Sequence, residues 1–195
     1  MKRFLCLLLA MLMLLLSLAM TACDGNKAND DDDDDTPSNS EKSESKDAKV
    51  NIPEGYKLYD NGAISFVYPE DWDKEEESGI VMLQNAEKSA NNITVVSEAK
   101  SDVYENMTVK DFNEMLKPSL EAAGMTVSGT TVQQTENGIG TKMTKIAYNV
   151  SMSGVSMKQT LYIVTAGEKI YSVTFTEVES DANIAKNIFD TLKVK

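Results

Sequence analysis

Residues 155–176, which read VSMKQTLYIVTAGEKIYSVTFT, determine the architecture of this 195-residue chain. Two runs rich in β-branched and aromatic residues, Val155–Ala166 and Lys169–Thr176, flank the turn residues Gly167-Glu168. A connection this short joins strands that are antiparallel neighbours in a sheet. The segment therefore predicts a long β-hairpin near the C-terminus.

Both strands of this hairpin carry apolar side chains on both faces. Leu161 and Ile163 point to one side of the sheet, while Tyr162 and Val164 point to the other. The second strand has the same property, because Ile170 is opposed by Tyr171, Val173 and Phe175. A sheet with one face in water alternates cleanly between apolar and polar residues. We therefore expect protein layers on both faces of this sheet.

The chain before this hairpin alternates between β-rich runs and turn residues. The other predicted strands are Tyr56–Tyr59, Ala63–Tyr68, Ile80–Leu83, Asn92–Ser97, Thr126–Gln134 and Thr141–Met152. Asn61-Gly62 and Asn137-Gly138 favour tight hairpins, because both residue types tolerate positive φ angles. The sheet is therefore expected to be mainly antiparallel.

Two segments change to the three- and four-residue period of a helix. The first stripe consists of Val109, Phe112, Leu116 and Leu120. Thr108 with Asp111 three residues later resembles a capping box, and Pro118 predicts a break near Lys117. A second helix is predicted from about Asp181 to Leu192. Two helices and the N-terminal hairpin can cover both faces, so the sequence predicts an α+β domain, an α/β/α sandwich spanning residues 51–195.

The order of these elements resembles the PsbP-like family, which is named for an extrinsic photosystem II subunit and includes many small bacterial lipoproteins. The similar segments are Ile64–Trp72, Ile93–Val96, the helix ending Ala122-Ala123-Gly124, Lys169–Thr176 and the terminal helix ending Leu192-Lys193. The resemblance implies a docking or accessory subunit of a membrane-associated assembly. It carries over no catalytic residue, and nothing in the sequence suggests photosynthesis.

The first 22 residues have the pattern of a secretory signal peptide. A basic start at Lys2 and Arg3 precedes the apolar run Phe4–Met20 and then Thr21-Ala22-Cys23. This ending resembles the lipobox of bacterial lipoproteins, in which the cysteine receives lipid, palmitate included, and becomes the new N-terminus. We therefore expect Cys23 to anchor the protein at the extracytoplasmic face of the cell membrane. Two alternatives are an uncleaved membrane helix and ordinary secretion with an incidental cysteine.

Residues 23–50 are predicted to form a disordered acidic tether. Asp24–Val50 contains ten acidic and four basic side chains and no aromatic residue. Such a segment buries too little apolar surface to offset the loss of chain entropy. The block Asp30–Asp35 also offers oxygen ligands for weak Ca²⁺ binding, although it lacks the glycine turn of an EF-hand loop.

The composition excludes several classes of site. Residues 24–195 contain no His, no Arg and no Cys. Ser-His and Cys-His nucleophilic sites and His/Cys metal sites are therefore excluded, and we expect no cofactor and no metal. The net charge of −12 disfavours nucleic-acid binding, because that affinity comes mainly from basic side chains. The expected protein is not an enzyme.

A few residues are candidates for a functional role. Trp72, the only tryptophan, is a weak candidate for an exposed partner-binding anchor, with a core position as the alternative. The other candidates are the acidic loop residues Asp71, Asp73, Glu75, Glu76 and Glu77, the tyrosines Tyr148, Tyr162 and Tyr171, and the methionines Met143, Met152 and Met157. A hydrated loop is the favoured interpretation for the carboxylates and core packing for the methionines, while strand tyrosines usually bridge core and solvent.

Three functions fit these observations. The first is a non-catalytic adaptor that docks onto an envelope protein or complex. The second is a receptor for a small ligand or a cation, because residues 51–195 carry −8 of the chain's net −12. The third is a cell-wall hydrolase that uses paired carboxylates. The partner and the binding surface are not specified by the sequence.

Overall fold

The computed structural model describes residues 51–195, so the predicted signal peptide and tether lie outside the described residues. Its main strands are β3 (Asp73–Glu77), β4 (Ile80–Gln84), β5 (Asn92–Ala99), β6 (Thr126–Glu136), β7 (Lys142–Met152), β8 (Val155–Ala166) and β9 (Lys169–Glu177). They form a seven-stranded sheet in the order β3-β4-β5-β9-β8-β7-β6. Every neighbouring pair is antiparallel, which confirms the predicted class.

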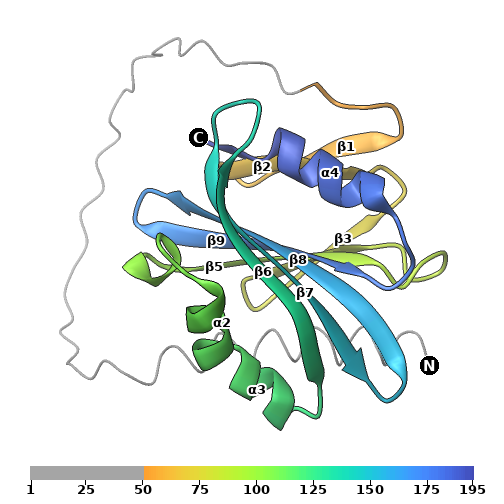
Figure 1. The fold of residues 1–195 in the computed structure, drawn as a ribbon. Helices are drawn as coiled ribbons and strands as arrows, with labels where there is room; N and C mark the ends of the chain where they lie inside the picture. The colour runs from red at the N-terminus through yellow and green to blue at the C-terminus, as the bar shows by residue number, and fades with distance from the viewer. Residues whose placement is uncertain (1–50) are drawn as a thin grey trace, which may run out of the picture.

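One face of this sheet is covered by a helix and a second, smaller sheet (Figure 1). The helix is α4 (Ala182–Thr191), and the small sheet contains β1 (Tyr56–Asp60), β2 (Ile64–Pro69) and β10 (Lys193–Val194). Phe66 of β2, Phe175 of β9 and Ile188 of α4 are fully buried in the core between these layers. The ring centroids of Tyr59 and Phe66 lie 4.9 Å apart in the same core.

The other face is covered by the 3₁₀ helix η2 (Asp102–Tyr104) and the helices α2 (Val109–Met115) and α3 (Lys117–Ala122). Phe112 of α2 packs on Tyr148 of β7, with ring centroids 4.9 Å apart. Leu161, Ile163 and Ile170 belong to this core, whereas their alternating neighbours in the same strands belong to the other. The prediction that both sheet faces are covered is confirmed.

The break in the first helical segment lies where the sequence placed it, within one residue. Thr108 and Asp111 form the expected capping box, with Thr108 N donating to the Asp111 carboxylate at 2.8 Å. Helix α2 ends at Met115, with Leu116 as its C-cap. Pro118 occupies the first turn of α3, where a backbone N–H has no partner within the helix, so proline costs no hydrogen bond. Within residues 51–195 no helix is long and apolar enough to cross a membrane.

The acidic segment Asp73–Glu77 was predicted as a loop, and that prediction is wrong. The segment is the edge strand β3, and all five side chains are exposed. Ser78 and Gly79 have φ angles of 52° and 78°, which is the conformation that a two-residue hairpin turn requires. Backbone pairing with β4 outweighs the low strand propensity of the charged residues, and their charges stay in water. The two-residue strand β10 was also not predicted.

Candidate functional site

The residues singled out from the sequence occupy different parts of the molecule. Cys23 and the block Asp30–Asp35 lie outside the described residues. Trp72 has an exposed fraction of 4% and packs in the core with Phe66, while its carbonyl accepts a hydrogen bond from Lys57 Nζ at 2.7 Å. The ring of Trp72 therefore occupies a core position, which was the alternative to an exposed partner-binding anchor.

The acidic residues around Trp72 are hydrated and partly paired with lysines. Asp71 lies 2.8 Å from Lys88 Nζ, and Glu76 lies 3.0 Å from Lys74 Nζ. The hydrogen bond from Lys88 holds the pKa of Asp71 below its usual range. Among the residues that the structure describes, no group of three or more His, Cys, Asp or Glu side chains is placed to hold a metal ion.

The tyrosines serve as neutral hydrogen-bond donors in the two cores. Tyr162 donates to the carbonyl of Ala185 at 2.8 Å, and Tyr148 donates to Gln159 Oε1 at 2.5 Å. Burial raises the pKa of Tyr148 and of Tyr162, so neither hydroxyl is poised to act as a base. Met143 and Met157 are also buried.

The most distinctive surface feature is the free edge of the seven-stranded sheet at β6. This strand is eleven residues long and pairs with β7 on one side only. Its sequence TVSGTTVQQTE carries a single charge, at Glu136. The opposite edge strand, β3, carries four acidic residues and one lysine. Charged side chains protect sheet edges against pairing with other chains, so β3 is protected and β6 is not.

A β-bulge divides β6 into an irregular and a regular half. The pairing register shifts between Ser128 and Thr131. Gly129 has a φ of 65°, a backbone conformation that favours glycine over residues with a Cβ atom. From Thr131 to Glu136 the register with β7 is continuous. This regular half is the segment whose outer backbone edge is suited to pairing.

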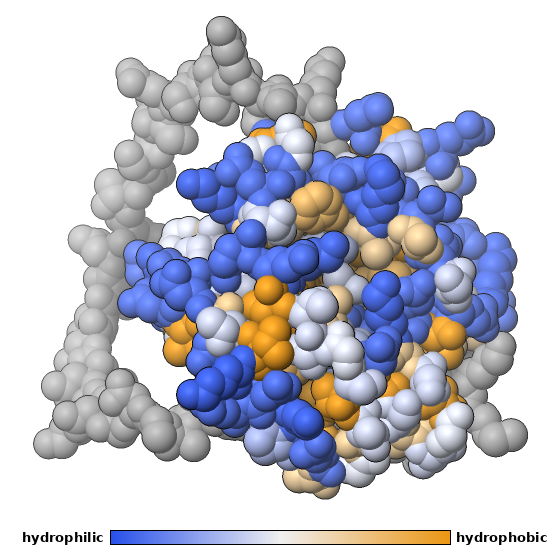
Figure 2. All heavy atoms as spheres, viewed as in Figure 1, coloured by the Kyte–Doolittle hydropathy of each residue, from blue (hydrophilic) through white to orange (hydrophobic). Residues whose placement is uncertain are grey.

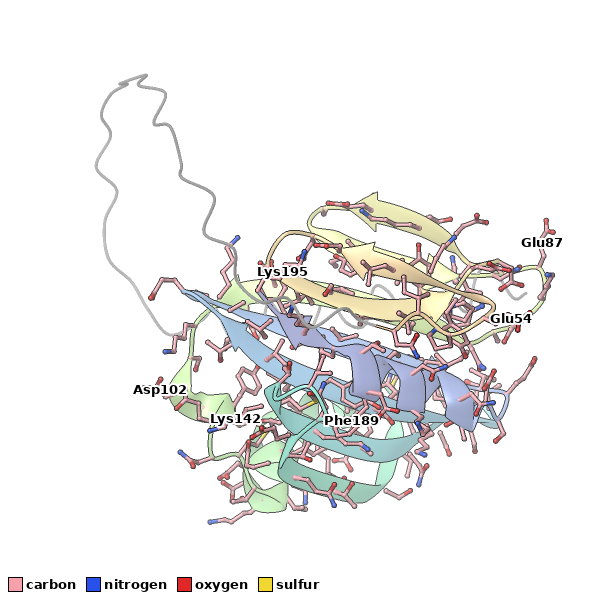
Figure 3. All side chains as sticks on the ribbon, turned by 90° about the horizontal axis from the view of Figure 1, so that it is seen from above. Glu54, Glu87, Asp102, Lys142, Phe189 and Lys195 are labelled. Atoms are coloured by element: carbon pink, nitrogen blue, oxygen red, sulfur yellow. The ribbon has the colours of Figure 1, made fainter. Side chains whose placement is uncertain are left out.

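A cleft of about 680 Å³ lies on one side of the regular half of β6. This η2 cleft is lined by residues that include Tyr104, Gln134, Glu136, Lys142, Met143 and Ile163. The carbonyl of Tyr104 joins η2 to the sheet, because Thr144 Oγ1 lies 2.6 Å from it and Gln134 Nε2 donates to it at 3.3 Å. Figure 3 shows Lys142 on the same side of the molecule as Asp102 of η2.

A second hollow of about 340 Å³ lies on the opposite sheet face, beside α4. This α4 groove is lined by residues that include Thr131, Gln133, Lys145, Lys158, Tyr162 and Ala185. Lys145 Nζ lies 5.8 Å from the ring centroid of Tyr162 and 5.3 Å from that of Phe189. Lys158 Nζ is 3.8 Å from the Glu177 carboxylate. Within residues 51–195 no carboxylate lies within 4.0 Å of Lys145 Nζ.

The β6 edge thus borders both hollows, which lie on opposite faces of the sheet. Figure 2 shows the face that contains β6, where small hydrophobic patches near α2 and α3 interrupt a largely hydrophilic surface. Sequence reasoning predicted the strand but not its position at the edge. The feature of the sequence that could have indicated this position is the absence of charged residues between Thr126 and Thr135, where Thr, Ser and Gln predominate.

The PsbP family model matches residues 54–193 of the chain. The chain belongs to the PsbP family. The resemblance predicted from the strand and helix order is therefore confirmed. A comparison with curated proteins finds no significant match. The PsbP-family match, residues 54–193, contains the whole of β6 and all the residues that line the two hollows.

A solved PsbP structure shows the same fold at low sequence identity. The solution structure of the cyanobacterial PsbP protein CyanoP from Synechocystis is 15% identical, with a TM-score of 0.57, and the match covers 78% of this chain and 99% of that chain. A crystal structure from Bacteroides thetaiotaomicron is 14% identical with a TM-score of 0.46, covering 68% of this chain but only 45% of that chain. LpqN of Mycobacterium tuberculosis, described as involved in cell envelope biogenesis, is 12% identical with a TM-score of 0.41, covering 72% and 90%.

Proposed function

We propose that this PsbP-family protein is a non-catalytic adaptor that is held at the extracytoplasmic face of the cell membrane by lipid on Cys23 and docks onto an envelope protein. The single observation that carries the docking role is the unprotected β6 edge between two hollows. Open sheet edges bind other polypeptides through backbone hydrogen bonds, with side-chain pockets supplying specificity. The lipid anchor and the tether would place this edge within reach of membrane proteins.

The side chains of residues 51–195 support binding rather than chemistry. The carboxylates of β3 point into water from an edge strand, and none of them lines either hollow. The buried tyrosine hydroxyls are donors inside the two cores. A docking function needs only the surface features that the described residues present.

Membrane anchoring is tested by metabolic labelling with radioactive palmitate. We expect the full chain to incorporate label and to fractionate with membranes, and Cys23→Ala to abolish the labelling. Cys6→Ala is the matched control, because Cys6 is predicted to leave with the signal peptide and its loss should change nothing. Labelling that survives in the Cys23→Ala variant would show that this cysteine is not the lipidated residue.

Docking is tested by photo-crosslinking the lipidated full chain in cells. A photoreactive amino acid is placed in turn at four exposed positions on different surfaces: Gln133, Glu75, Glu121 and Lys186. We expect one dominant envelope protein to crosslink from at least one position. A chain that ends after Val50 is the control and should capture nothing. An empty result at all four positions would contradict the adaptor function and would favour a small ligand in the η2 cleft.

A further inference from the structure

We infer that the partner contributes an extended strand that pairs with the regular half of β6 and carries acidic side chains on the face over the α4 groove. This inference rests on the proposed adaptor function and names its contact surface and the chemistry of its partner. The contact is β6 from Thr131 to Glu136, about 20 Å of strand at 3.2–3.4 Å per residue.

Strand geometry assigns each hollow to one set of partner side chains. Side chains of an added strand alternate between the two faces of the sheet, as do those of β6 itself. Thr131 and Gln133 line the α4 groove, whereas Gln134 and Glu136 line the η2 cleft, together with Thr135 near the end of the strand. A strand beside β6 therefore directs every second side chain toward one hollow and the others toward the second.

The charge of the α4 groove determines which partner side chains would fit on that face of the sheet. Lys158 is paired with Glu177, and Glu177 also accepts a hydrogen bond from the backbone N–H of Asp181 at 2.9 Å. Among residues 51–195, the Lys145 ammonium group lies over the rings of Tyr162 and Phe189 and has no carboxylate within 4.0 Å. A partner carboxylate at this position would supply the opposite charge that Lys145 lacks. This cation stands out because residues 51–195 are acidic overall.

The lining of the η2 cleft favours a different kind of partner side chain. Tyr104, Met143 and Ile163 give it an apolar part, and Glu105 and Glu136 outnumber Lys142, so the net negative charge of the lining would repel a carboxylate. Medium-sized apolar side chains fit such a lining. The expected partner strand therefore alternates acidic and apolar residues.

A second copy of this chain is the competing occupant of the edge, and charge argues against it. In a pair of two β6 strands, each strand would bring one carboxylate, Glu136 at its last position, and otherwise only Ser, Thr, Val, Gly and Gln side chains. Two chains of net charge −12 would also repel each other. A partner strand with acidic side chains along its length supplies more opposite charge to Lys145 than self-pairing does.

The register of the sheet provides a pair of matched variants. Gln133 lies directly opposite Lys145 in the β6–β7 pair, and both side chains line the α4 groove. Gln133→Glu should form a cross-strand ion pair with Lys145 and compete with the partner carboxylate. Gln133→Lys should add a third lysine to the groove, beside Lys145 and Lys158. The two variants are exposed and of similar size, so they are expected to fold equally well.

The binding experiment uses the purified, lipidated full chain in detergent and two fluorescent eight-residue peptides, one alternating Glu and Val and the other alternating Lys and Val. We expect the Glu/Val peptide to bind at least tenfold more tightly, with affinity falling at 0.5 M salt. Lys145→Gln and Gln133→Glu should each weaken it at least fivefold, and Gln133→Lys should strengthen it. Lys169→Gln removes an exposed lysine away from both hollows and should have no effect. Equal binding of the two peptides, or no effect of Lys145→Gln, would overturn the inference.

Crosslinking in cells separates this inference from the adaptor function. Gln133 and Glu75 are exposed residues on the two edge strands, so they form a matched pair. We expect the partner to crosslink from Gln133 and not from Glu75. Capture only from Glu75, Glu121 or Lys186 would overturn the β6 inference and leave the adaptor function standing. A chain that crosslinks from Gln133 only to a second copy of itself would overturn the partner strand in favour of self-association.

Discussion

Replacing Asn137 by alanine is expected to lower the free energy of unfolding by about 2–4 kcal/mol, because one buried side chain makes four hydrogen bonds. Asn137 Nδ2 donates to the carbonyls of Phe189 and Leu192, each at 2.8 Å. Its Oδ1 accepts from the backbone N–H of Thr141 at 2.9 Å and of Ile139 at 3.3 Å. The side chain therefore ties the β6–β7 hairpin to the end of α4.

The cost arises because these partners do not reach water when the side chain is removed. Asn137 has an exposed fraction of 6%, and the carbonyls at the end of a helix have no partners within the helix. Alanine would leave both carbonyls unpaired, and a buried unpaired polar group costs about 1–3 kcal/mol. Asn137→Asp should be at least as harmful, since it places a carboxylate oxygen against two carbonyl oxygens.

The measurement is urea unfolding of the purified full chain, followed by the fluorescence of Trp72. This residue is the only tryptophan and is buried in the core that contains α4, so its emission reports loss of that core. Asn183→Ala is the control, because Asn183 is exposed on the same helix and its replacement should cost less than about 0.5 kcal/mol. Equal midpoints for Asn137→Ala and Asn183→Ala would show that the hairpin is not held by this side chain.

Local patterns in the sequence predicted most of the individual elements. The strand Val155–Ala166 has the expected bounds, and the capping box at Thr108 is present. The alternation of Leu161 with Tyr162 correctly predicted two cores. These features depend on residues close together in the chain, so a single sequence contains the necessary information.

Features that depend on distant contacts were not predicted. The strand order brings β5 beside β9 and not beside β6, and this leaves β6 at an edge. Asn137 was recognised as a turn residue, but the carbonyls it binds lie 52 and 55 residues further along the chain. Asn91 likewise accepts from the backbone N–H groups of Val178 and Glu179, at 2.8 and 2.9 Å. The hollows beside β6 arise from the same long-range pairing, so the candidate site was not predicted either.

Replacing Phe175 by alanine is expected to have the largest effect on stability, about 3–5 kcal/mol. Phe175 lies on β9, the central strand of the seven-stranded sheet, and its side chain is fully buried on the face covered by α4. Removing the ring takes away its buried apolar surface and leaves a cavity that the sheet backbone cannot close by moving. Such a loss is a large part of the 5–15 kcal/mol that stabilises a typical domain.

Conservative variants test whether the two cores are independent. Phe175→Leu and Phe112→Leu each keep an apolar side chain and should cost less than about 1.5 kcal/mol. The two residues lie in cores on opposite faces of the sheet, so the double variant should equal the sum of the single effects within about 0.5 kcal/mol. Urea unfolding at neutral pH measures all three. A coupling larger than 1 kcal/mol would mean that the sheet transmits packing changes between its faces, and substitutions in the core beside α4 would then also disturb the η2 cleft.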